Sequence, residues 1–352
     1  MRRLVFLILP ILLFGFALAQ EGTLQSVPVD YPPVLDGMVG EPFWADAPVF
    51  EVETFGSGYW GAVNASETTV ELRSVYTGDG VYFLVRWADP TYSIDRQRWS
   101  FDGSAWTRQD QTPLREGGAN TFYEDKFAFL WVMDSKSVVE DESFWPTYRD
   151  DAEAVAIGYD RPVHTMPEGE RLDMWHFKYV RNNFATPGQV DDQFMDDDTE
   201  RANAGRGSDP GEGGYYTNVK DYTDASGATV QGPRYHVPGN TNLYILTQDM
   251  VDRGVAVEIA DHAELMALPA GTHLAAVVGR AFTGSRADIT AKAVWSDGWY
   301  TLELGRALDT GDADHDVIFA DLDMPYFFGV ATFDNSQISH GNTDLIPFVF
   351  QK

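Results

Sequence analysis

Hydrophobic and polar residues alternate along many short segments of this chain, with the period of two that is typical of half-buried β-strands. Residues 68–91 (TTVELRSVYTGDGVYFLVRWADPT) predict two strands joined by a turn at 77–80, because Gly and Asp favour tight hairpin turns. Residues 287–308 predict a second hairpin, which turns at 296–298. The same alternation predicts further strands over residues 125–134, 171–180, 326–335 and 346–351.

Helical periodicity is scarce, and residues 247–268 predict one short helix. Many short strands separated by Gly, Pro and Asp turns favour an all-β fold with minor helices, built as an antiparallel β-sandwich. Residues 185–240 lack this alternation of hydrophobic and polar residues and are rich in Gly, Asp, Asn and Pro. A loop of this length inside a compact domain is usually functional or an interaction surface. We therefore predict a single domain over residues 21–352 with a long irregular, loop-rich insertion at 185–240.

Residues 171–183 (RLDMWHFKYVRNN) combine aromatic and basic side chains within an acidic chain. Consecutive side chains of a strand point to opposite faces. The two faces consist of Trp175, Phe177 and Tyr179, and of Met174, His176 and Lys178. The residues alone leave open whether the second face meets water, a core or a bound cofactor.

The first twenty residues (MRRLVFLILPILLFGFALAQ) have the features of a secretory signal peptide. Two arginines precede an apolar run at residues 4–16, and small residues from Ala17 to Ala19 resemble a cleavage site. The apolar run is shorter than the roughly 20 residues of a membrane span. We expect cleavage after Ala19 or Gln20, with an uncleaved anchor as the alternative, and an exported, periplasmic protein that has no membrane span after cleavage.

The composition narrows the classes of partner. The chain has 25 basic and 54 acidic residues and a formal charge of −29, which becomes −31 without the two arginines of the signal peptide. Such a field disfavours nucleic acid and anionic membranes, and favours solubility or a basic partner. The absence of cysteine excludes disulfides, thiolate metal sites, iron–sulfur clusters and covalent c-type haem.

Signatures of common catalytic sites are missing from the sequence: it has no G-x-S-x-G, no P-loop and no H-E-x-x-H motif. The acidic run Asp191, Asp192 and 196–198 offers hard oxygen ligands to calcium. The run lacks the spacing of an EF-hand, so a solvated loop is the favoured interpretation and a calcium site the alternative.

Histidine and methionine offer a different chemistry, because both ligate haem iron in an apolar pocket. His164 and Met166 fall in a predicted loop directly before the strand at 171–180, and His340 falls in a loop between the last two strands. A loop Met or His is more often a surface or packing residue. These residues alone indicate no more than an exported β-sandwich with candidate ligands.

Several segments, taken in order, resemble the haem-binding domain related to ethylbenzene dehydrogenase, the γ-subunit type found with molybdenum enzymes of the dimethyl-sulfoxide-reductase superfamily. The segments are VLDGMVGEPFWADAP, VELRSVYTGDGVYFLVRWADPT, YEDKFAFLWVM, RLDMWHFKYVR, GSRADITAKAVWSDGWYTLELGRALDTGDADHDVIF and FGVATFDNSQISHG. The resemblance covers about residues 32–350, and its most specific parts are D-x-W-H-[WF]-K, G-S-R-A-D-[IV] and F-D-N…H. Relatives accompany ethylbenzene and dimethylsulfide dehydrogenases, selenate and chlorate reductases, and nitrite oxidoreductase.

The resemblance implies a β-sandwich that holds one non-covalent b-type haem between axial side chains from loops. The best-known relatives use a methionine and a lysine. The methionine falls ahead of the strand that matches DMWHFK, which points to Met166. Where those relatives have the lysine, this sequence has His340. The implied iron ligands are therefore Met166 and His340, and the alternatives are His340 with His164 or a methionine–lysine pair.

The resemblance also implies a use for each face of the strand at 171–183. Its three aromatic rings would pack into the sandwich core, and His176 and Lys178 would lie near the pocket. There they would bind haem propionates or pair with acids such as Asp173, and a salt-bridged strand face is the alternative. Arg286 and Lys292 are further propionate candidates, because a guanidinium binds a carboxylate in bidentate fashion.

The function that the resemblance implies is electron transfer, not catalysis. The chain would connect the iron–sulfur subunit of a periplasmic molybdoenzyme, which also has a molybdopterin subunit, with a soluble cytochrome c. Its negative charge suits a basic cytochrome. The alternative is an exported carbohydrate-binding β-sandwich without haem, since such modules share the LDG…E..W start, and a third is a haem-less structural or sensory relative.

Overall fold

The computed structural model describes residues 22–56, 67–109, 122–136, 165, 168–184, 188–198, 200, 205–337 and 339–352. The predicted signal peptide at 1–20 lies outside these ranges, as do His164 and Met166. Within them, no helix combines the length and apolar character that crossing a membrane requires.

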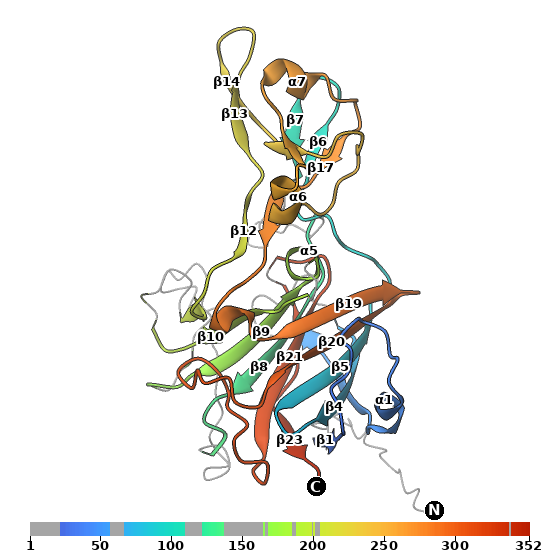
Figure 1. The fold of residues 1–352 in the computed structure, drawn as a ribbon, viewed down its shortest axis with the longest axis vertical. Helices are drawn as coiled ribbons and strands as arrows, with labels where there is room; N and C mark the ends of the chain where they lie inside the picture. The colour runs from blue at the N-terminus through green and yellow to red at the C-terminus, as the bar shows by residue number, and fades with distance from the viewer. Residues whose placement is uncertain are drawn as a thin grey trace, which may run out of the picture.

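One 14-stranded sheet folds over on itself to form the two layers of a β-sandwich (Figure 1). The first half of its strand order is β11 (Arg206–Ser208), β10 (Asp191–Met195), β9 (Leu172–Lys178), β8 (Lys126–Val132), β21 (Tyr326–Phe333) and β23 (Ile346–Phe350). The second half is β1 (Leu24–Pro28), β4 (Thr69–Tyr76), β5 (Gly80–Ala88), β20 (Trp299–Ala307) and β19 (Thr290–Ser296). Three short strands pair beside this path: β2 (Phe50–Glu53), β3 (Phe55–Gly56) and β22 (Gly341–Asn342). Most neighbours are antiparallel, but β1 runs parallel to both β23 and β4. The predicted all-β class and its sandwich architecture are confirmed.

The core between the two halves is dominated by aromatic rings. Phe83 of β5 meets the rings of Phe129, Trp131 and Trp175 in the opposite half at centroid distances of 5.2 to 5.7 Å. These rings come from alternate positions of β8 and β9, because every second side chain of a strand faces the same side. The predicted strands are present, and the aromatic face of residues 171–179 lies in the core as expected.

Strand β9 is shorter than predicted, because the chain turns into a helix after Lys178. Helix α5 covers Tyr179–Asn182. The Oε2 atom of Glu124 accepts hydrogen bonds from the backbone N–H groups of Val180 (2.7 Å) and Arg181 (3.1 Å). A carboxylate there satisfies N–H groups that the first turn of a helix leaves unpaired. A contact this distant in sequence is invisible to local periodicity.

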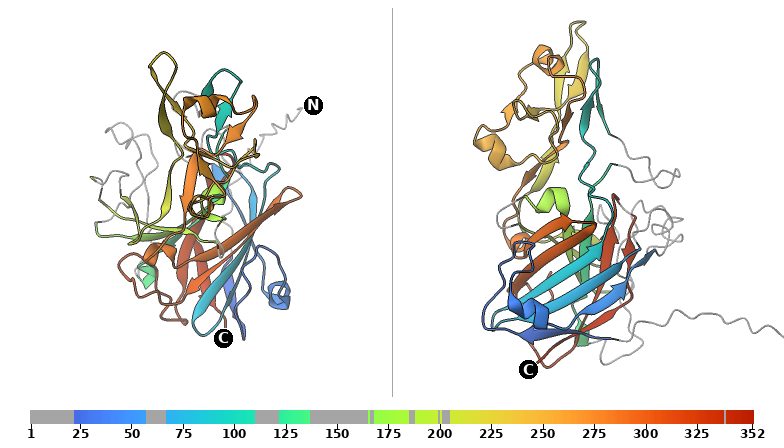
Figure 2. Two further views of the ribbon diagram at one scale, coloured as in Figure 1. Left: turned by 45° about the horizontal axis from the view of Figure 1, so that its top comes forward. Right: turned by 90° about the vertical axis from the view of Figure 1, so that its right-hand side faces the viewer.

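A smaller lobe stands at one end of the sandwich (Figures 1 and 2). Its strands are β6 (Trp99–Phe101), β7 (Trp106–Arg108), β12 (Gly214–Thr217), β13 (Lys220–Thr223), β14 (Thr229–Gly232), β15 (Tyr235–His236), β16 (Val257–Glu258), β17 (His273–Leu274) and β18 (Val277–Arg280). Its helices are α6 (Gln248–Asp252) and α7 (His262–Met266), two where the sequence predicted one. Buried residues including Trp99, Leu243 and Leu274 form a separate hydrophobic cluster there.

The region predicted as a loop-rich insertion, 185–240, therefore contributes to both lobes. Strands β10 and β11 extend the sandwich, and β12 to β15 belong to the smaller lobe. These strands escape prediction because their alternation is interrupted by Gly and Asp. That one domain spans 21–352 stays a prediction.

Candidate functional site

A cavity of about 410 Å³ lies on the outer face of the first half of the sheet, where β8, β9, β10 and β21 run side by side. Gln337, His340, Asn342 and Thr343 also line it, as do residues of β11 and Tyr215 of β12. The basic residues of the lining are Arg96, Lys126, Lys178, Arg181, Arg206 and Arg286. The remaining lining residues used below are Leu130, Met174, His176, Asp191, Gln193, Met195, Ala331, Phe333 and His340. The volume is within the range of small-molecule and cofactor sites.

The same alternation that places the aromatic residues in the core directs the other side chains into this cavity. Met174, His176 and Lys178 of β9 all line it, while Trp175 and Phe177 are 1% and 2% exposed in the core. The predicted division of the strand into a core face and a pocket face is thus present in the structure.

Lys178 is paired with Asp191, which belongs to the neighbouring strand β10. The other oxygen of Asp191 accepts a hydrogen bond from Arg286 Nε at 2.6 Å. Burial raises the pKa of Asp191, but Lys178 and Arg286 outweigh burial and hold the pKa below its usual value. The expectation that Asp173 would pair with this face is wrong: Asp173 lies on the core side, where Arg306 Nη1 donates to its Oδ2 at 3.0 Å.

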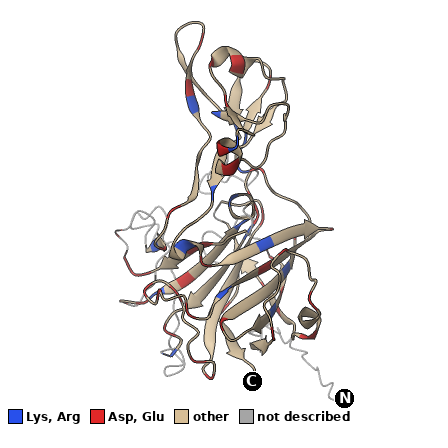
Figure 3. Cartoon of the chain, viewed as in Figure 1, with Lys and Arg blue, Asp and Glu red and all other residues tan. Residues whose placement is uncertain are grey.

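A second buried ion pair closes the end of the cavity next to the smaller lobe. Arg181 is paired with Glu124, and the Nε atom of Arg96 lies 3.7 Å from the same carboxylate oxygen. Both guanidinium groups also lie over the ring of Tyr215 from β12, at 5.2 and 5.6 Å. Six basic side chains thus stand in the described lining, whose one carboxylate is Asp191. This local surplus of positive charge contrasts with the acidic positions spread over the whole chain (Figure 3).

Three nitrogen donors gather around the ring of Phe333. The ring centroid lies 5.6 Å from that of His176 and 4.8 Å from that of His340. Lys126 Nζ lies 3.9 Å from the ring centroid and donates a hydrogen bond to the carbonyl oxygen of Gln337 at 2.9 Å. Burial, together with nearby basic groups, lowers the pKa of Lys126 well below its usual value, so its amine has a tendency to be neutral.

His176 has a buried ring nitrogen that nothing in the described chain satisfies. Its Nδ1 lies 3.0 Å from Arg206 Nη2 and 3.3 Å from Gln193 Oε1, whereas its Nε2 is buried without a hydrogen-bond partner among the described residues. Burial, and then the positive charges of Lys178 and Arg206, lower the pKa of His176 well below 6.5. A neutral imidazole with an unsatisfied nitrogen indicates a cavity that accommodates a further group.

The structure brings together four of the seven predicted site residues. His176, Lys178, Arg286 and His340 line the same cavity although they lie far apart in the sequence. Lys292 is not among the residues that line it, and Lys292 Nζ donates to the carbonyl oxygen of Asn183 at 2.6 Å. The structure therefore gives Lys292 no role in this cavity.

Met166 and His164 lie outside the described residues, but the residue between them is placed. Thr165 donates its backbone N–H to the carbonyl oxygen of Asp196 at 3.0 Å. Asp196 directly follows Met195, which lines the cavity. Thr165, the residue directly before Met166, therefore lies beside the end of β10 that borders the cavity.

The first part of the acidic run at 191–198 is not the solvated loop that its composition suggested, whereas residues 196–198 follow β10 as a loop in which Asp198 is exposed. Asp191 and Asp192 belong to β10 and are 5% and 0% exposed. They also point to opposite faces of the strand, so they cannot converge on one calcium ion as neighbours. Acidic residues buried in ion pairs are the exception to the rule that charges stay in solvent, which is why composition misled here.

Lys126, Arg181 and Arg206 also belong to the site, and sequence reasoning missed all three. Lys126 occupies an outward position of a predicted strand, so the alternation could have found it once the pocket face was known. Arg206 comes from the region taken as irregular, and its approach to His176 depends on the pairing of β10 with β9 and β11.

The lining fits the group that the sequence resemblance implies. Apolar side chains from β8, β9 and β21 offer a surface for a flat macrocycle, and the neutral imidazole of His176 and the ring of His340 offer nitrogen ligands for iron. The basic side chains suit a pair of carboxylates. His340 meets the expectation most directly, because it lines the cavity next to Phe333.

Comparisons with known proteins agree with the sequence segments. The family model described as ethylbenzene dehydrogenase matches residues 41–344. A search of curated protein sequences found no match. Among solved structures, the chain is similar to a family 9 carbohydrate-binding module from Caldicellulosiruptor kristjanssonii in complex with cellotriose, at 8% identity and a TM-score of 0.32 over 94% of each chain. A family 9 module from the same organism in complex with glucose is similar at 8% identity and a TM-score of 0.31, over 93% of this chain and 95% of that one.

At this identity and TM-score, neither structure carries an inference about a ligand. The family model matches far more than half of the chain. The protein belongs to the ethylbenzene dehydrogenase family.

Proposed function

We propose that this protein is a periplasmic b-type haem protein that transfers electrons within a molybdoenzyme complex. The observation that carries the proposal is the cavity on the outer face of β8, β9, β10 and β21, which joins neutral nitrogen donors to an apolar wall and a positive rim. Membership of the ethylbenzene dehydrogenase family supports association with such complexes.

His340 and Met166 are the proposed axial ligands. His340 stands at the cavity wall beside Phe333, and the segment that carries Met166 is held at Thr165 by its hydrogen bond to Asp196. A haem bound here supplies one-electron transfer, and axial-ligand identity is one of the main determinants of its potential. A histidine in place of the lysine of known relatives therefore changes the expected potential.

Arg286, Arg206 and Lys178 are the proposed partners of the two propionates. Arg286 and Lys178 converge on Asp191, which holds them at the cavity before any ligand arrives. A guanidinium binds a carboxylate with directed N–H groups, so these side chains would orient the group as well as attract it.

The proposal makes the chain an electron-transfer subunit and leaves substrate turnover to a molybdopterin subunit. Electrons would pass between an iron–sulfur subunit and a soluble cytochrome c. The formal charge of −29 supports docking to a basic cytochrome, which salt would weaken.

The carbohydrate-binding alternative requires aromatic rings that face solvent as a platform. Within the described ranges, the exposed large hydrophobic residues include tyrosines but no tryptophan, and Trp44, Trp87, Trp131 and Trp175 are buried. These rings stabilise the core, so the exposed aromatic surface of the described chain offers tyrosines such as Tyr31 and Tyr92 but no exposed tryptophan as a platform.

The test is the absorption spectrum of the purified mature chain with haem, oxidised and then reduced with dithionite. We expect a sharp reduced α-band of b-type haem that Met166→Ala and His340→Ala each shift or abolish. His262→Ala, in the smaller lobe, is the matched control and is expected to leave the spectrum unchanged. No Soret band after reconstitution with haem would overturn the proposal. A spectrum indifferent to both ligand variants would overturn the ligand pair.

A further inference from the structure

A second group of buried charges lies on the opposite face of β9 and β10 from the cavity. Asp173 of β9 and Asp192 of β10 are both 0% exposed and share the core side of the sheet. Asp316, which follows β20, is 2% exposed, and one carboxylate oxygen from each of the three lies within 4.8 Å of the other two. Three carboxylates this close and this buried repel one another strongly unless something compensates their charge.

Arg306 of β20 compensates part of this charge. Its Nη1 lies 3.0 Å from Asp173 Oδ2 and 3.3 Å from Asp316 Oδ1. It lies farther, at 3.7 Å, from Asp192 Oδ2. One guanidinium carries a single positive charge, so a balance of the remaining carboxylates requires another cation or bound protons.

An independent observation comes from Asp209, which directly follows β11 and is 2% exposed. Both of its carboxylate oxygens are buried and accept no hydrogen bond within the described structure. The charges of Asp173, Asp316 and Asp288 act on it, and it acts in turn on Asp192, so this buried side chain lies beside the three carboxylates. Asp288, at the end of the short helix η2 (Ser285–Ala287), has two further buried oxygens without a partner.

The unsatisfied atoms form a set of ligands. Oδ1 of Asp173, both oxygens of Asp209 and both oxygens of Asp288 have no hydrogen-bond partner in the described structure. Oδ2 of Asp192 and Oδ1 of Asp316 accept no hydrogen bond there either, and they face Arg306 Nη1 at 3.7 and 3.3 Å. The second oxygens of Asp173 and Asp192 are already used, by the backbone N–H groups of Val317 (2.9 Å) and Gln193 (3.1 Å). The protein thus fixes Asp173 and Asp192 by backbone donors, and it leaves Oδ1 of Asp173 without a partner in the described structure.

We infer that Asp173, Asp192, Asp209, Asp288 and Asp316 form a calcium-binding site. Calcium takes six to eight oxygen ligands at about 2.3–2.6 Å, so two ligands of one ion lie at most about 5.2 Å apart. The carboxylate oxygens of Asp173, Asp192 and Asp316, which all lie within 4.8 Å of one another, satisfy this limit. Magnesium normally keeps several water molecules and suits a buried all-carboxylate cage poorly. Zinc prefers nitrogen and sulfur ligands, and the cluster offers carboxylates.

The competing account of the cluster is protonation. Burial raises the pKa of Asp173 to about 7 and that of Asp209 to about 9, so without a metal ion protons would neutralise part of the cluster. A shared proton between Asp209 and Asp316 would also explain their approach. The two accounts differ in what calcium does to the protein, because only a calcium site is stabilised by the ion.

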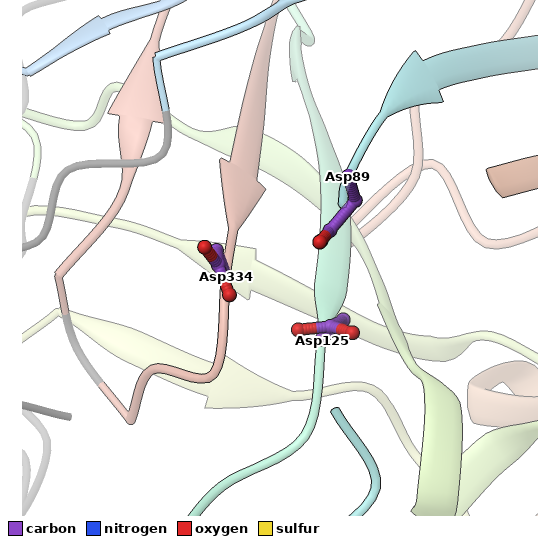
Figure 4. Close-up of side chains that lie close together, drawn as sticks. All are labelled: Asp89, Asp125 and Asp334. Atoms are coloured by element: carbon purple, nitrogen blue, oxygen red, sulfur yellow. The ribbon is translucent and has the colours of Figure 1, made fainter. Parts of the chain in front are cut away.

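A different trio of carboxylates serves as the internal control. Asp89, Asp125 and Asp334 also approach one another (Figure 4). There the oxygens of Asp125 accept hydrogen bonds from the backbone N–H groups of Ser93 and Asn335, both at 2.8 Å, and from Tyr300 Oη at 2.5 Å. Because these donors already satisfy Asp125, and no oxygen of the trio is a buried atom without a hydrogen-bond partner in the described structure, the trio lacks open ligands for a metal ion.

The experiment measures calcium content and thermal stability of the full mature chain. After EDTA treatment and dialysis against calcium, elemental analysis is expected to give one calcium per chain, and calcium but not magnesium is expected to raise Tm. Asp209→Asn and Asp288→Asn are chosen because neither side chain is used by a backbone donor. Each is expected to weaken calcium binding at least tenfold and to abolish the calcium-dependent rise in Tm. Asp334→Asn, in the control trio, is expected to keep both.

Several results would overturn the inference. One is a wild-type protein that holds no calcium and whose Tm does not change when calcium is added. Another is Asp209→Asn that raises Tm in EDTA yet leaves calcium binding intact, which would establish protonation as the correct account. A third is loss of calcium in Asp334→Asn but not in Asp209→Asn, which would move the ion to the control trio. An equal rise in Tm with magnesium would overturn the assignment to calcium.

Discussion

Lys178 and Asp191 form an ion pair between adjacent strands at the wall of the cavity, and both side chains are almost completely buried. Asp191 holds Arg286 with its other oxygen. A buried carboxylate between two cations fixes both of them, and its removal leaves Arg286 charged without this partner. Burial already lowers the pKa of Lys178 to about 7 although Asp191 raises it, so the same removal favours a neutral Lys178. This relationship makes Asp191 the residue that organises the positive side of the cavity.

We predict that Asp191→Asn lowers the free energy of unfolding by about 3 kcal/mol, because breaking a buried ion pair leaves uncompensated charge. Urea denaturation of the haem-free protein measures the change. Asp249→Asn is the control, since Asp249 pairs with Arg253 on the surface at 69% exposure and such pairs contribute at most about 1 kcal/mol. Equal losses in the two variants would show that burial of the Asp191 pair has no energetic consequence.

Arg286 and Lys292 are six residues apart, yet the structure gives them different roles. Arg286 lines the cavity and Lys292 donates to the backbone of Asn183. We expect Arg286→Gln to weaken haem retention about tenfold or more, the size of a charge-assisted hydrogen bond. Lys292→Gln is expected to retain haem like the wild type. The rate of haem transfer to apomyoglobin measures both, and equal rates in the two variants would contradict the placement of the propionates.

The core between the sheet halves is predicted to be sensitive to loss of Phe83, which meets four rings of the opposite half. Phe83→Ala removes a completely buried ring and is expected to cost about 3–5 kcal/mol in the free energy of unfolding. Phe55→Ala, at a position 42% exposed, is expected to change it by about 0.5 kcal/mol or less. Urea midpoints of the two variants test this, and similar midpoints would mean that the halves are not held together by this ring cluster.

Asn218 connects several segments of the smaller lobe. Its side chain donates to the carbonyl oxygens of Tyr235 (3.0 Å) and Ala275 (2.8 Å), and its Oδ1 accepts from the backbone N–H groups of Arg234 and Tyr235. Asn218→Ala leaves these buried backbone groups without a partner, at about 1–3 kcal/mol each. We expect the variant to be cleaved faster by protease within residues 214–280, with the sandwich still intact. Gln231→Ala, on the exposed β14, is the control, and cleavage equally fast in both would contradict the role of Asn218.

The sequence predicted the features of this fold that depend on local alternation. The hairpins and the two faces of residues 171–178 follow from a period of two, which any half-buried strand must obey. What it could not predict depends on pairing between distant segments. The cavity exists because β10 and β11 extend the sheet beside β9, and both lie in a region whose Gly and Asp content suggested a loop.

The environment of the charged residues was also unpredictable from local sequence, because it depends on pairing between distant segments. Asp191 and Asp192 looked like solvated acids, because their partners Lys178 and Arg306 are recognised only when β9, β10 and β20 are placed in space. His340 was identified through a family resemblance that covers its surrounding motif. Lys126 and Arg206 had no such motif, and their contribution emerges from the geometry alone.

Glu303 provides a pH-dependent prediction away from the cavity. It is 0% exposed and accepts hydrogen bonds from Trp44 Nε1 of α1 (Pro42–Asp46) at 2.9 Å and from the backbone N–H groups of Asp36 and Gly37 at 3.1 and 2.9 Å. Burial nevertheless raises the pKa of Glu303 from 4.5 to about 7, more than these donors lower it.

Because the pKa of Glu303 is higher in the folded than in the unfolded state, the folded state binds more protons between these values. Its contribution to stability is therefore complete below pH 4.5 and is lost as the pH rises to about 7, by about 3 kcal/mol in total. Glu303→Gln cannot ionise, so its stability relative to the wild type should rise across this range, even if it is the less stable protein at pH 4.5 through an impaired hydrogen bond. Urea unfolding of both proteins at pH 4.5, 6 and 8 measures the difference. If the free energies of unfolding of the two proteins change with pH in parallel, the folded protein keeps Glu303 ionised. The three N–H groups that donate to Glu303 would then fully offset the cost of its burial.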